Sequence, residues 1–144
     1  MFLGEYIYTL DDKGRLTIPS RFRDQFEHGV VITRGLDGCL FVFTHEDWQK
    51  LTEILGEKLS FTQEKARHLV RFLCSGATDA VADRQGRILI PAFLREYAKL
   101  EADVVIAGAN TRLELWNPEK WREMMREVES NVEMIAEQFG NITF

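Results

Sequence analysis

The sequence is poor in the residues that build several common kinds of site. It contains only two cysteines and three histidines among 144 residues. No Cys-x-x-Cys pair occurs and no two histidines have a metal-binding spacing, which argues against a zinc centre. Because we expect a reducing compartment, Cys39 and Cys74 are expected to be two buried free thiols rather than a disulfide.

Long hydrophobic runs are also missing. The longest apolar runs, such as residues 39–43, have about five residues, whereas a membrane-spanning helix needs roughly 20. The first eight residues include Glu5 and lack a long apolar stretch, so we expect no signal peptide and a cytoplasmic protein. Hydrophobic residues make up 45% of the chain, which is enough for a buried core and argues against wholesale disorder.

Signatures of catalysis are scarce as well. The segment Gly35–Gly38 lacks the Gly-Lys-Ser/Thr ending of a phosphate-binding loop, and hairpin geometry explains it better. Neither Ser20 nor Ser75 has a nearby histidine and acid that would form a nucleophile signature. We therefore expect no catalytic residues, no cofactor, no metal and no small-molecule substrate.

The net charge of −5 has the wrong sign for a typical nucleic-acid-binding domain, but it is unevenly distributed. Residues 11–23 carry four basic and two acidic side chains, a local charge of +2. Residues 83–95 carry three basic and one acidic side chain, again +2, whereas six glutamates follow from Glu119 onward. Because salt screens charges beyond about 8–10 Å, basic turns can coexist with an acidic tail if the fold separates them.

The chain contains an internal repeat. The segment Asp11–Pro19 recurs as Asp83–Pro91 at an offset of 72 residues, and the offset becomes 73 farther along. We therefore divide the chain into a first half at 1–60, a linking helix at 61–74 and a second half at 75–144. The identities at the first offset are Gly4/Gly76, Asp11/Asp83, Gly14/Gly86, Arg15/Arg87, Ile18/Ile90, Pro19/Pro91 and Arg23/Arg95.

Each half has the same pattern of predicted elements. In the first half, strands are predicted at 5–10 and 15–18, with a short helix that begins at Pro19. A hairpin of strands at 30–33 and 39–43 follows, and then a helix capped by Thr44. Strands this short cannot bury two faces alone, so we expect one interleaved β-barrel made from both halves, with helices outside.

The repeated turns are the strongest candidates for a functional site. One interpretation is a tight turn in which aspartate caps backbone amides, glycine adopts positive φ and arginine pairs with the aspartate. The same geometry would hold a guanidinium rigidly for bidentate contact with a phosphate or a guanine. Duplicated surface arginines favour the second interpretation. The candidate residues are Asp11, Lys13, Gly14 and Arg15 in the first copy, and Asp83, Arg84, Gly86 and Arg87 in the second.

Three further arginines follow the repeated prolines. Arg21 is either a solvated charge or a phosphate contact, and Arg23 and Arg95 could instead tie a helix to the barrel through ion pairs. We treat all three as supporting residues.

The last predicted helix carries apolar residues at helical spacing from Trp121 to Phe139, which spans nearly 27 Å at 1.5 Å per residue. Packing on its own barrel is one explanation. The barrel is too small to cover the whole stripe, so we expect part of it to contact a neighbouring subunit, together with the helix that carries Trp48.

The chain resembles the MraZ family of the AbrB-like swapped-hairpin barrels. The resemblance rests on the opening Met1–Tyr6, the two Asp-x-x-Gly-Arg turns, Thr33–Asp37 and Phe72–Ala77, and it covers nearly the whole chain. It implies an α+β fold with a pseudo-two-fold swapped-hairpin barrel, formed by both halves as one intertwined domain.

The resemblance also implies a function. Members of the family are bacterial transcription regulators associated with the nucleoid, which bind short G-rich direct repeats in double-stranded DNA. Their target is the promoter of the division and cell-wall gene cluster, and they assemble as rings of about eight subunits. Their Asp-x-x-x-Arg turns contact DNA and match Asp11/Arg15 and Asp83/Arg87 here. An AbrB-like antitoxin, a ring-forming scaffold and a barrel-fold enzyme remain alternatives.

Overall fold

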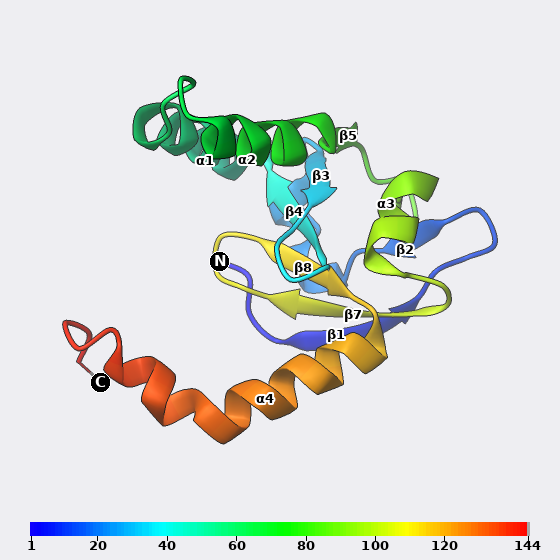
Figure 1. Ribbon diagram of the computed structural model, residues 1–144. Coiled ribbons are helices and arrows are strands. Elements are labelled where there is room, and N and C mark those ends of the chain that lie inside the picture. Colours follow the sequence, from blue (N-terminus) through cyan, green and yellow to red (C-terminus); the bar gives the residue numbers. More distant parts are fainter. Residues whose placement is uncertain (144) are drawn as a thin grey trace.

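The computed structural model describes residues 1–143 as an α+β fold with a six-stranded antiparallel sheet and a separate two-stranded ribbon (Figure 1). The strands are β1 (Glu5–Thr9), β2 (Arg15–Thr17), β3 (Val30–Arg34), β4 (Leu40–Thr44), β5 (Thr78–Ala80), β6 (Arg87–Leu89), β7 (Asp103–Gly108) and β8 (Leu113–Trp116). The helices are η1 (Ser20–Phe22), η2 (Asp24–Phe26), α1 (His45–Lys58), α2 (Glu64–Ser75), α3 (Ala92–Ala98) and α4 (Pro118–Glu137).

The two halves of the chain exchange strands. The sheet order is β1-β7-β8-β4-β3-β5, so β1 of the first half pairs with β7 of the second. Correspondingly, β5 of the second half pairs with β3 of the first, and β2 pairs with β6. Each half therefore completes its hydrogen-bonded sheet only with strands from the other half.

The closed barrel that we expected is not confirmed. Within residues 1–143, β1 and β5 are the outer strands of the large sheet, and the ribbon strands β2 and β6 pair only with each other. Both ribbon strands have three residues, which is too short to bridge the two edges while also forming the ribbon. The sheet is therefore open.

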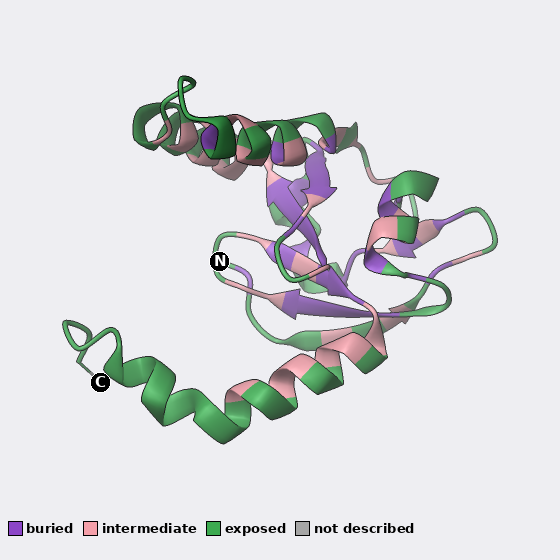
Figure 2. Cartoon of the chain, viewed as in Figure 1, coloured by how far each residue is buried: buried purple, intermediate pink, exposed green. Residues whose placement is uncertain are grey.

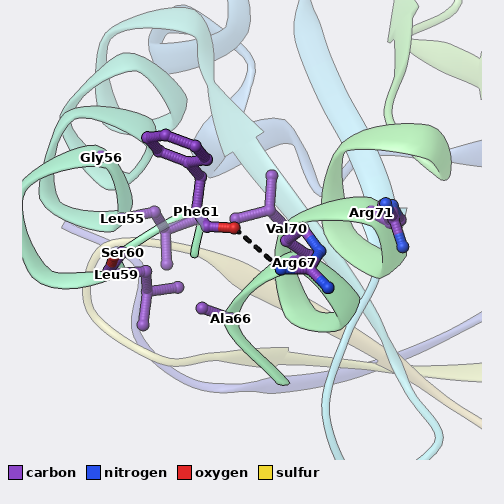
Figure 3. Close-up of a pocket in the computed structure, with 9 residues that line it drawn as sticks. All are labelled: Leu55, Gly56, Leu59, Ser60, Phe61, Ala66, Arg67, Val70 and Arg71. Atoms are coloured by element: carbon purple, nitrogen blue, oxygen red, sulfur yellow. Dashed lines mark hydrogen bonds between the residues drawn. The ribbon is translucent and has the colours of Figure 1, made fainter. Parts of the chain in front are cut away.

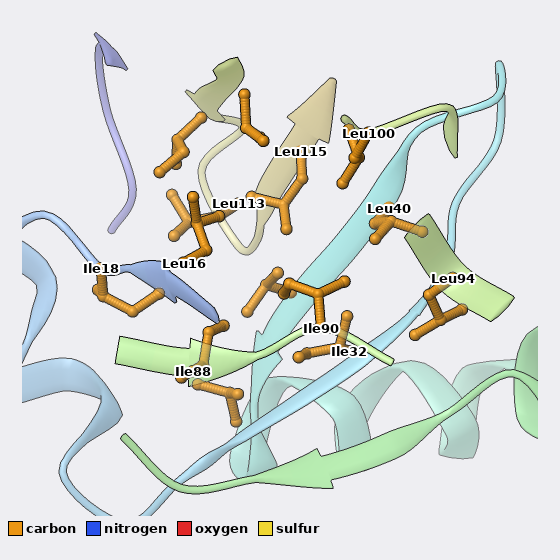
Figure 4. Packing of buried hydrophobic residues seen from close by; sticks show 14 of the residues in the cluster. Leu16, Ile18, Ile32, Leu40, Ile88, Ile90, Leu94, Leu100, Leu113 and Leu115 are labelled. Carbon is orange, nitrogen blue, oxygen red and sulfur yellow. The ribbon is translucent and has the colours of Figure 1, made fainter. Parts of the chain in front are cut away.

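The ribbon is anchored by its inward-facing side chains. Leu16 of β2 lies opposite Ile88 of β6, and both are completely buried. Figure 4 shows them in one cluster with Ile18, Ile90 and aliphatic side chains from the large sheet. Burying a side chain of this size contributes about 1.5–3 kcal/mol, so the core fixes the position of the ribbon and of the turns beside it.

A second apolar cluster lies on the outer face of the sheet, under α1 and α4. The side chains of Trp48 and Trp121, at matching positions of the repeat, pack against it. Thr44 Oγ1 accepts a hydrogen bond from Asp47 N at 3.0 Å and caps α1, as the sequence predicted. Asn117 caps α4 in the same way, through the backbone N–H groups of residues 119 and 120.

Several local expectations need correction. The segment after Pro19 forms two 3₁₀ turns, and Pro19 precedes the first of them. The matching segment of the second half is the α-helix α3, which has Ala92 where the first half has Ser20, and alanine is the better helix former. Cys39 is buried, but Cys74 is exposed on the outward face of α2, because its neighbour Leu73 takes the inward position. The helix predicted at 62–73 is observed as α2, two residues later.

Figure 2 shows that burial along α4 ends midway. Its first half is partly covered by the sheet, and every residue from Glu129 to Thr143 is exposed. No helix within residues 1–143 has the length and hydropathy that a bilayer crossing would require.

Candidate nucleic-acid interface

The first repeated turn is organised by one carboxylate. Asp11 Oδ1 accepts hydrogen bonds from the backbone N–H groups of Lys13 at 2.9 Å and Arg15 at 2.8 Å. Gly14 has φ +80°, a conformation that favours glycine, and its N–H donates to the Asp11 carbonyl at 3.1 Å. The local sequence therefore specifies this turn through an aspartate that replaces missing backbone partners.

The second turn repeats this geometry. Asp83 Oδ1 accepts from Gln85 N and Arg87 N, both at 2.9 Å, and Gly86 has φ +77°. The tight-turn interpretation of both motifs is confirmed.

The two arginines are held by the same aspartates through one edge of each guanidinium. Arg15 Nε donates to Asp11 Oδ2 at 2.6 Å, and Arg87 Nε donates to Asp83 Oδ2 at 2.8 Å. The side chains remain 30% and 26% exposed. Because the aspartates occupy the Nε positions, the terminal Nη groups are the donors left for an external acceptor.

Both carboxylates are stabilised in the charged form. The backbone N–H of Arg15, opposed by desolvation and assisted by the Arg15 side chain, lowers the pKa of Asp11 to about 2. The backbone N–H of Arg87 has the main effect on Asp83, whose pKa is also lowered. The aspartates are therefore ionised at neutral pH and can orient the guanidinium groups continuously.

Strand pairing brings the two turns side by side, although they lie 72 residues apart in the sequence. Ile18 N donates to the Gly86 carbonyl at 2.8 Å, and Ile90 N donates to the Gly14 carbonyl at 2.9 Å. Each turn is thus hydrogen-bonded to the strand that follows the other turn. The spacing of the motifs could not reveal this, because it depends on how the halves pair.

Arg23 and Arg95 lie across the opposite turns. A Cβ atom on Gly86 would lie 2.5 Å from Arg23 Nε, and one on Gly14 would lie 2.8 Å from Arg95 Cζ. Arg23 Nε also donates to the Ile18 carbonyl at 3.3 Å, and Arg95 makes the equivalent bond to Ile90 at 3.0 Å. Their contacts are structural. The repeat identities paired each arginine with a glycine, but the sequence did not reveal that the pairs cross.

The remaining basic candidates are in different situations. Lys13 and Arg84 are exposed beside the turns, and neither forms an ion pair within residues 1–143. Arg21 donates to Tyr6 Oη at 2.7 Å and lies 5.4 Å from the centroid of the Phe22 ring. The structure therefore ties Arg21 to β1, whereas Lys13 and Arg84 border the paired turns.

The same surface was searched for metal-binding groups. Among the residues that the structure describes, no three His, Cys, Asp or Glu side chains are placed to hold a metal ion. The chemistry available at the ribbon is therefore that of guanidinium and ammonium donors, which suits an anionic or guanine-bearing partner.

Comparison with known proteins agrees with the repeat. The family model "MraZ protein, putative antitoxin-like" matches twice, over residues 1–72 and 73–140. The transcriptional regulator MraZ of Moorella thermoacetica is 50% identical over 138 residues, which cover 96% of each chain. Those of Roseiflexus sp. strain RS-1 and Roseiflexus castenholzii are 46% and 47% identical over the full length of both chains. The chain belongs to the MraZ family.

Proposed function

We propose that this protein is a DNA-binding transcription regulator that reads double-stranded DNA with the β2–β6 ribbon. The observation that carries the proposal is the adjacency of two identical turns, each with an arginine oriented by an ionised aspartate. The relatives that match over their full length bear the name transcriptional regulator, which supports a regulator rather than an enzyme.

The turns suit the chemistry of a major groove. A two-stranded β element fits that groove, and arginine bonds bidentately to guanine O6 and N7. In our proposal Arg15 and Arg87 contact guanine edges with their Nη groups, while Lys13 and Arg84 contact phosphates. Arg21 contributes at most one further phosphate contact, because Tyr6 already holds it.

One subunit offers few cations, so its binding alone is weak. Non-specific affinities are about 10⁻⁴–10⁻⁶ M at physiological salt. Several linked modules on repeated sites gain about 10²–10⁴ in avidity. We therefore propose a ring of about eight subunits on short G-rich direct repeats, at the promoter of the division and cell-wall gene cluster, in association with the nucleoid.

The exchanged strands support one intertwined domain of the AbrB-like swapped-hairpin kind. In this proposal the halves at 1–60 and 75–144 act together, joined by the linking helix at 61–74, and each contributes one turn to the DNA-binding ribbon.

The exposed half of α4 favours a second candidate, a ring-forming scaffold with incidental DNA contact. The words "antitoxin-like" in the family description keep an AbrB-like antitoxin as a further alternative. A salt titration separates these candidates, because a regulator retains a difference between repeat and scrambled DNA across salt concentrations.

The reading head is tested by gel shift on G-rich repeat DNA. Arg15→Ala should abolish binding, with the mass of the oligomer unchanged on gel filtration, and Arg87→Ala should weaken it. Arg21→Ala is the matched control and should bind almost as the wild type does. Undiminished binding by both Arg15→Ala and Arg87→Ala would remove the ribbon as the reading element.

A further inference from the structure

The linker between α1 and α2 leaves a hollow of about 350 Å³. Figure 3 shows it between the end of α1 and the start of α2, with Leu55, Leu59, Ala66 and Val70 around it. Phe61, which is 83% exposed, stands at its border. We call this surface the α1–α2 groove. It is an apolar surface that nothing else within residues 1–143 covers.

The border of the groove is basic. Arg67 and Arg71 are its only charged lining residues, and Arg67 Nη1 donates to the Phe61 carbonyl at 3.0 Å. Over residues 55–71 the chain has four basic and two acidic side chains, a net charge of +2 excluding His68. An occupant of this groove should therefore be apolar on one face and acidic at its borders.

The exposed half of α4 has this chemistry. Val132, Ile135 and Phe139 recur at helical spacing and are all exposed, Phe139 to 54%. From residue 127 to residue 143 the chain carries four glutamates and neither lysine nor arginine. We call this segment the α4 tail. Its sequence pattern is that of an amphipathic acidic helix, which binds apolar grooves through residues at these spacings.

The dimensions of the two surfaces also agree. At 1.5 Å per residue, residues 129–139 extend over about 16 Å and α2 over about 18 Å. A helix can therefore lie along α2 with its apolar face over the groove.

The tail cannot reach the groove of its own chain. In Figure 1, α1 and α2 lie at the top of the view, and the tail diverges from the body at the bottom. Because α4 starts directly after β8 and packs against β7, its first half is fixed on the sheet. The occupant that fits is the tail of another copy.

We propose that the α4 tail of one subunit docks in the α1–α2 groove of the next subunit. The inference rests on the ring that we proposed above and identifies the surfaces that build it. Each copy carries one tail and one groove at separate places, so the contact is head-to-tail, and contacts of this type generate rings when the rotation closes. Arg67 and Arg71 would then lie beside Glu129 and Glu133 of the docked tail.

Mixing two variants of the full chain tests this arrangement. In the tail variant, Ile135→Asp and Phe139→Asp remove the apolar face. In the groove variant, Arg67→Glu and Arg71→Glu reverse the charge of the border. Each variant alone should have the monomer mass of 16.7 kDa by light scattering. An equimolar mixture should form a particle of twice 16.7 kDa, because one intact tail meets one intact groove and no further contact is possible.

Controls separate docking from loss of fold. Met134→Asp changes an exposed residue of the same helix that points away from the apolar face, and it should keep the wild-type mass. Combining Arg67→Glu and Arg71→Glu with Glu129→Arg and Glu133→Arg in one chain should restore the oligomer. All changed side chains are on the surface, so circular dichroism and thermal unfolding should match the wild type.

Specific outcomes would overturn the inference. It is wrong if the tail or the groove variant keeps the wild-type mass, or if their mixture stays monomeric. A monomeric wild type would overturn both the ring and this contact. The DNA-binding proposal is judged separately, because the tail variant should still bind one repeat through Arg15 while losing about 10²–10⁴ of avidity on several repeats.

Discussion

Arg87 Nη1 lies 3.7 Å from Asp11 Oδ2, so Asp11 contacts the guanidinium groups of both turns. Asp11 holds Arg15 through Nε at 2.6 Å and faces Arg87 across the ribbon. Asp83, in contrast, forms an ion pair only with Arg87 within residues 1–143. The two halves match in sequence at these positions, but the pair of turns is electrostatically asymmetric.

The asymmetry predicts unequal effects of the two aspartates on DNA binding. Asp11→Asn should weaken binding to repeat DNA more than Asp83→Asn, because it removes the partner of two guanidinium groups. At this exposure each ion pair contributes about 0.2–1 kcal/mol. Fluorescence anisotropy with labelled repeat DNA, at fixed salt, measures the difference.

A double-mutant cycle provides the control for that comparison. Asp11→Asn and Arg87→Ala should be coupled in their effects on DNA affinity. Asp83→Asn and Arg15→Ala share no ion pair and should be additive within about 0.3–0.5 kcal/mol. Equal coupling in the two cycles would contradict the asymmetry.

The sequence predicted the elements of the site better than their arrangement. The motif Asp11–Arg15 specified the turn locally, because an aspartate, a glycine and the intervening amides suffice for its hydrogen bonds. The adjacency of the two turns depends on the pairing of β2 with β6, which links residues 72 apart. No local pattern encodes such a contact, and only the repeat suggested that the halves interlock.

The errors have similar causes. The closed barrel was inferred from strand lengths, which do not determine where a sheet ends. Cys74 was expected to be buried, but an α-helix places consecutive residues on different faces, and Leu73 faces inward. The stripe of the last helix was correctly expected to exceed its own sheet, since Trp121 packs and Phe139 is exposed.

The crossed contact between Arg23 and Gly86 predicts a costly glycine substitution. Gly86→Ala places Cβ 2.5 Å from Arg23 Nε and imposes φ +77° on a residue with a side chain. Positive φ alone costs roughly 1–2 kcal/mol, and displacing Arg23 adds to it. The free energy of unfolding, from urea titration, should fall by at least that amount.

Two further variants separate these effects. Gly56→Ala in α1 meets open space and should stabilise the protein by about 0.8–1 kcal/mol. Gly86→Ala combined with Arg23→Ala should retain the cost of positive φ and lose the steric part. Equal costs for Gly86→Ala with and without Arg23 would show that Arg23 does not confine the turn.

The lowered pKa of Asp11 predicts a turn that weakens only in acid. A carboxyl group whose pKa is lower in the folded than in the unfolded chain stabilises the fold above its unfolded value of about 3.9. This contribution is lost as pH falls through the folded pKa of about 2. Carbon-13 NMR titration of the Asp11 carboxyl should give a midpoint near that value.

The cause of this shift can be tested with the same titration. The backbone N–H of Arg15 has the largest effect, so Arg15→Ala should raise the pKa of Asp11 only in part. Gly14→Ala, which strains the turn itself, should raise it further. A complete return to the ordinary value in Arg15→Ala would show that the side chain, and not the turn, stabilises the carboxylate.

The last prediction concerns the anchor of the ribbon. Leu16 is completely buried opposite Ile88, so Leu16→Ala should lower the free energy of unfolding by about 2–5 kcal/mol through lost burial and a residual cavity. Leu89, on the same ribbon, is 55% exposed, and Leu89→Ala should change stability by less than about 0.5 kcal/mol. Urea unfolding measures both variants. Because the ribbon carries both turns, Leu16→Ala should also weaken DNA binding at temperatures where the protein is still folded, whereas similar affinities of the two variants would mean that the core does not position the turns.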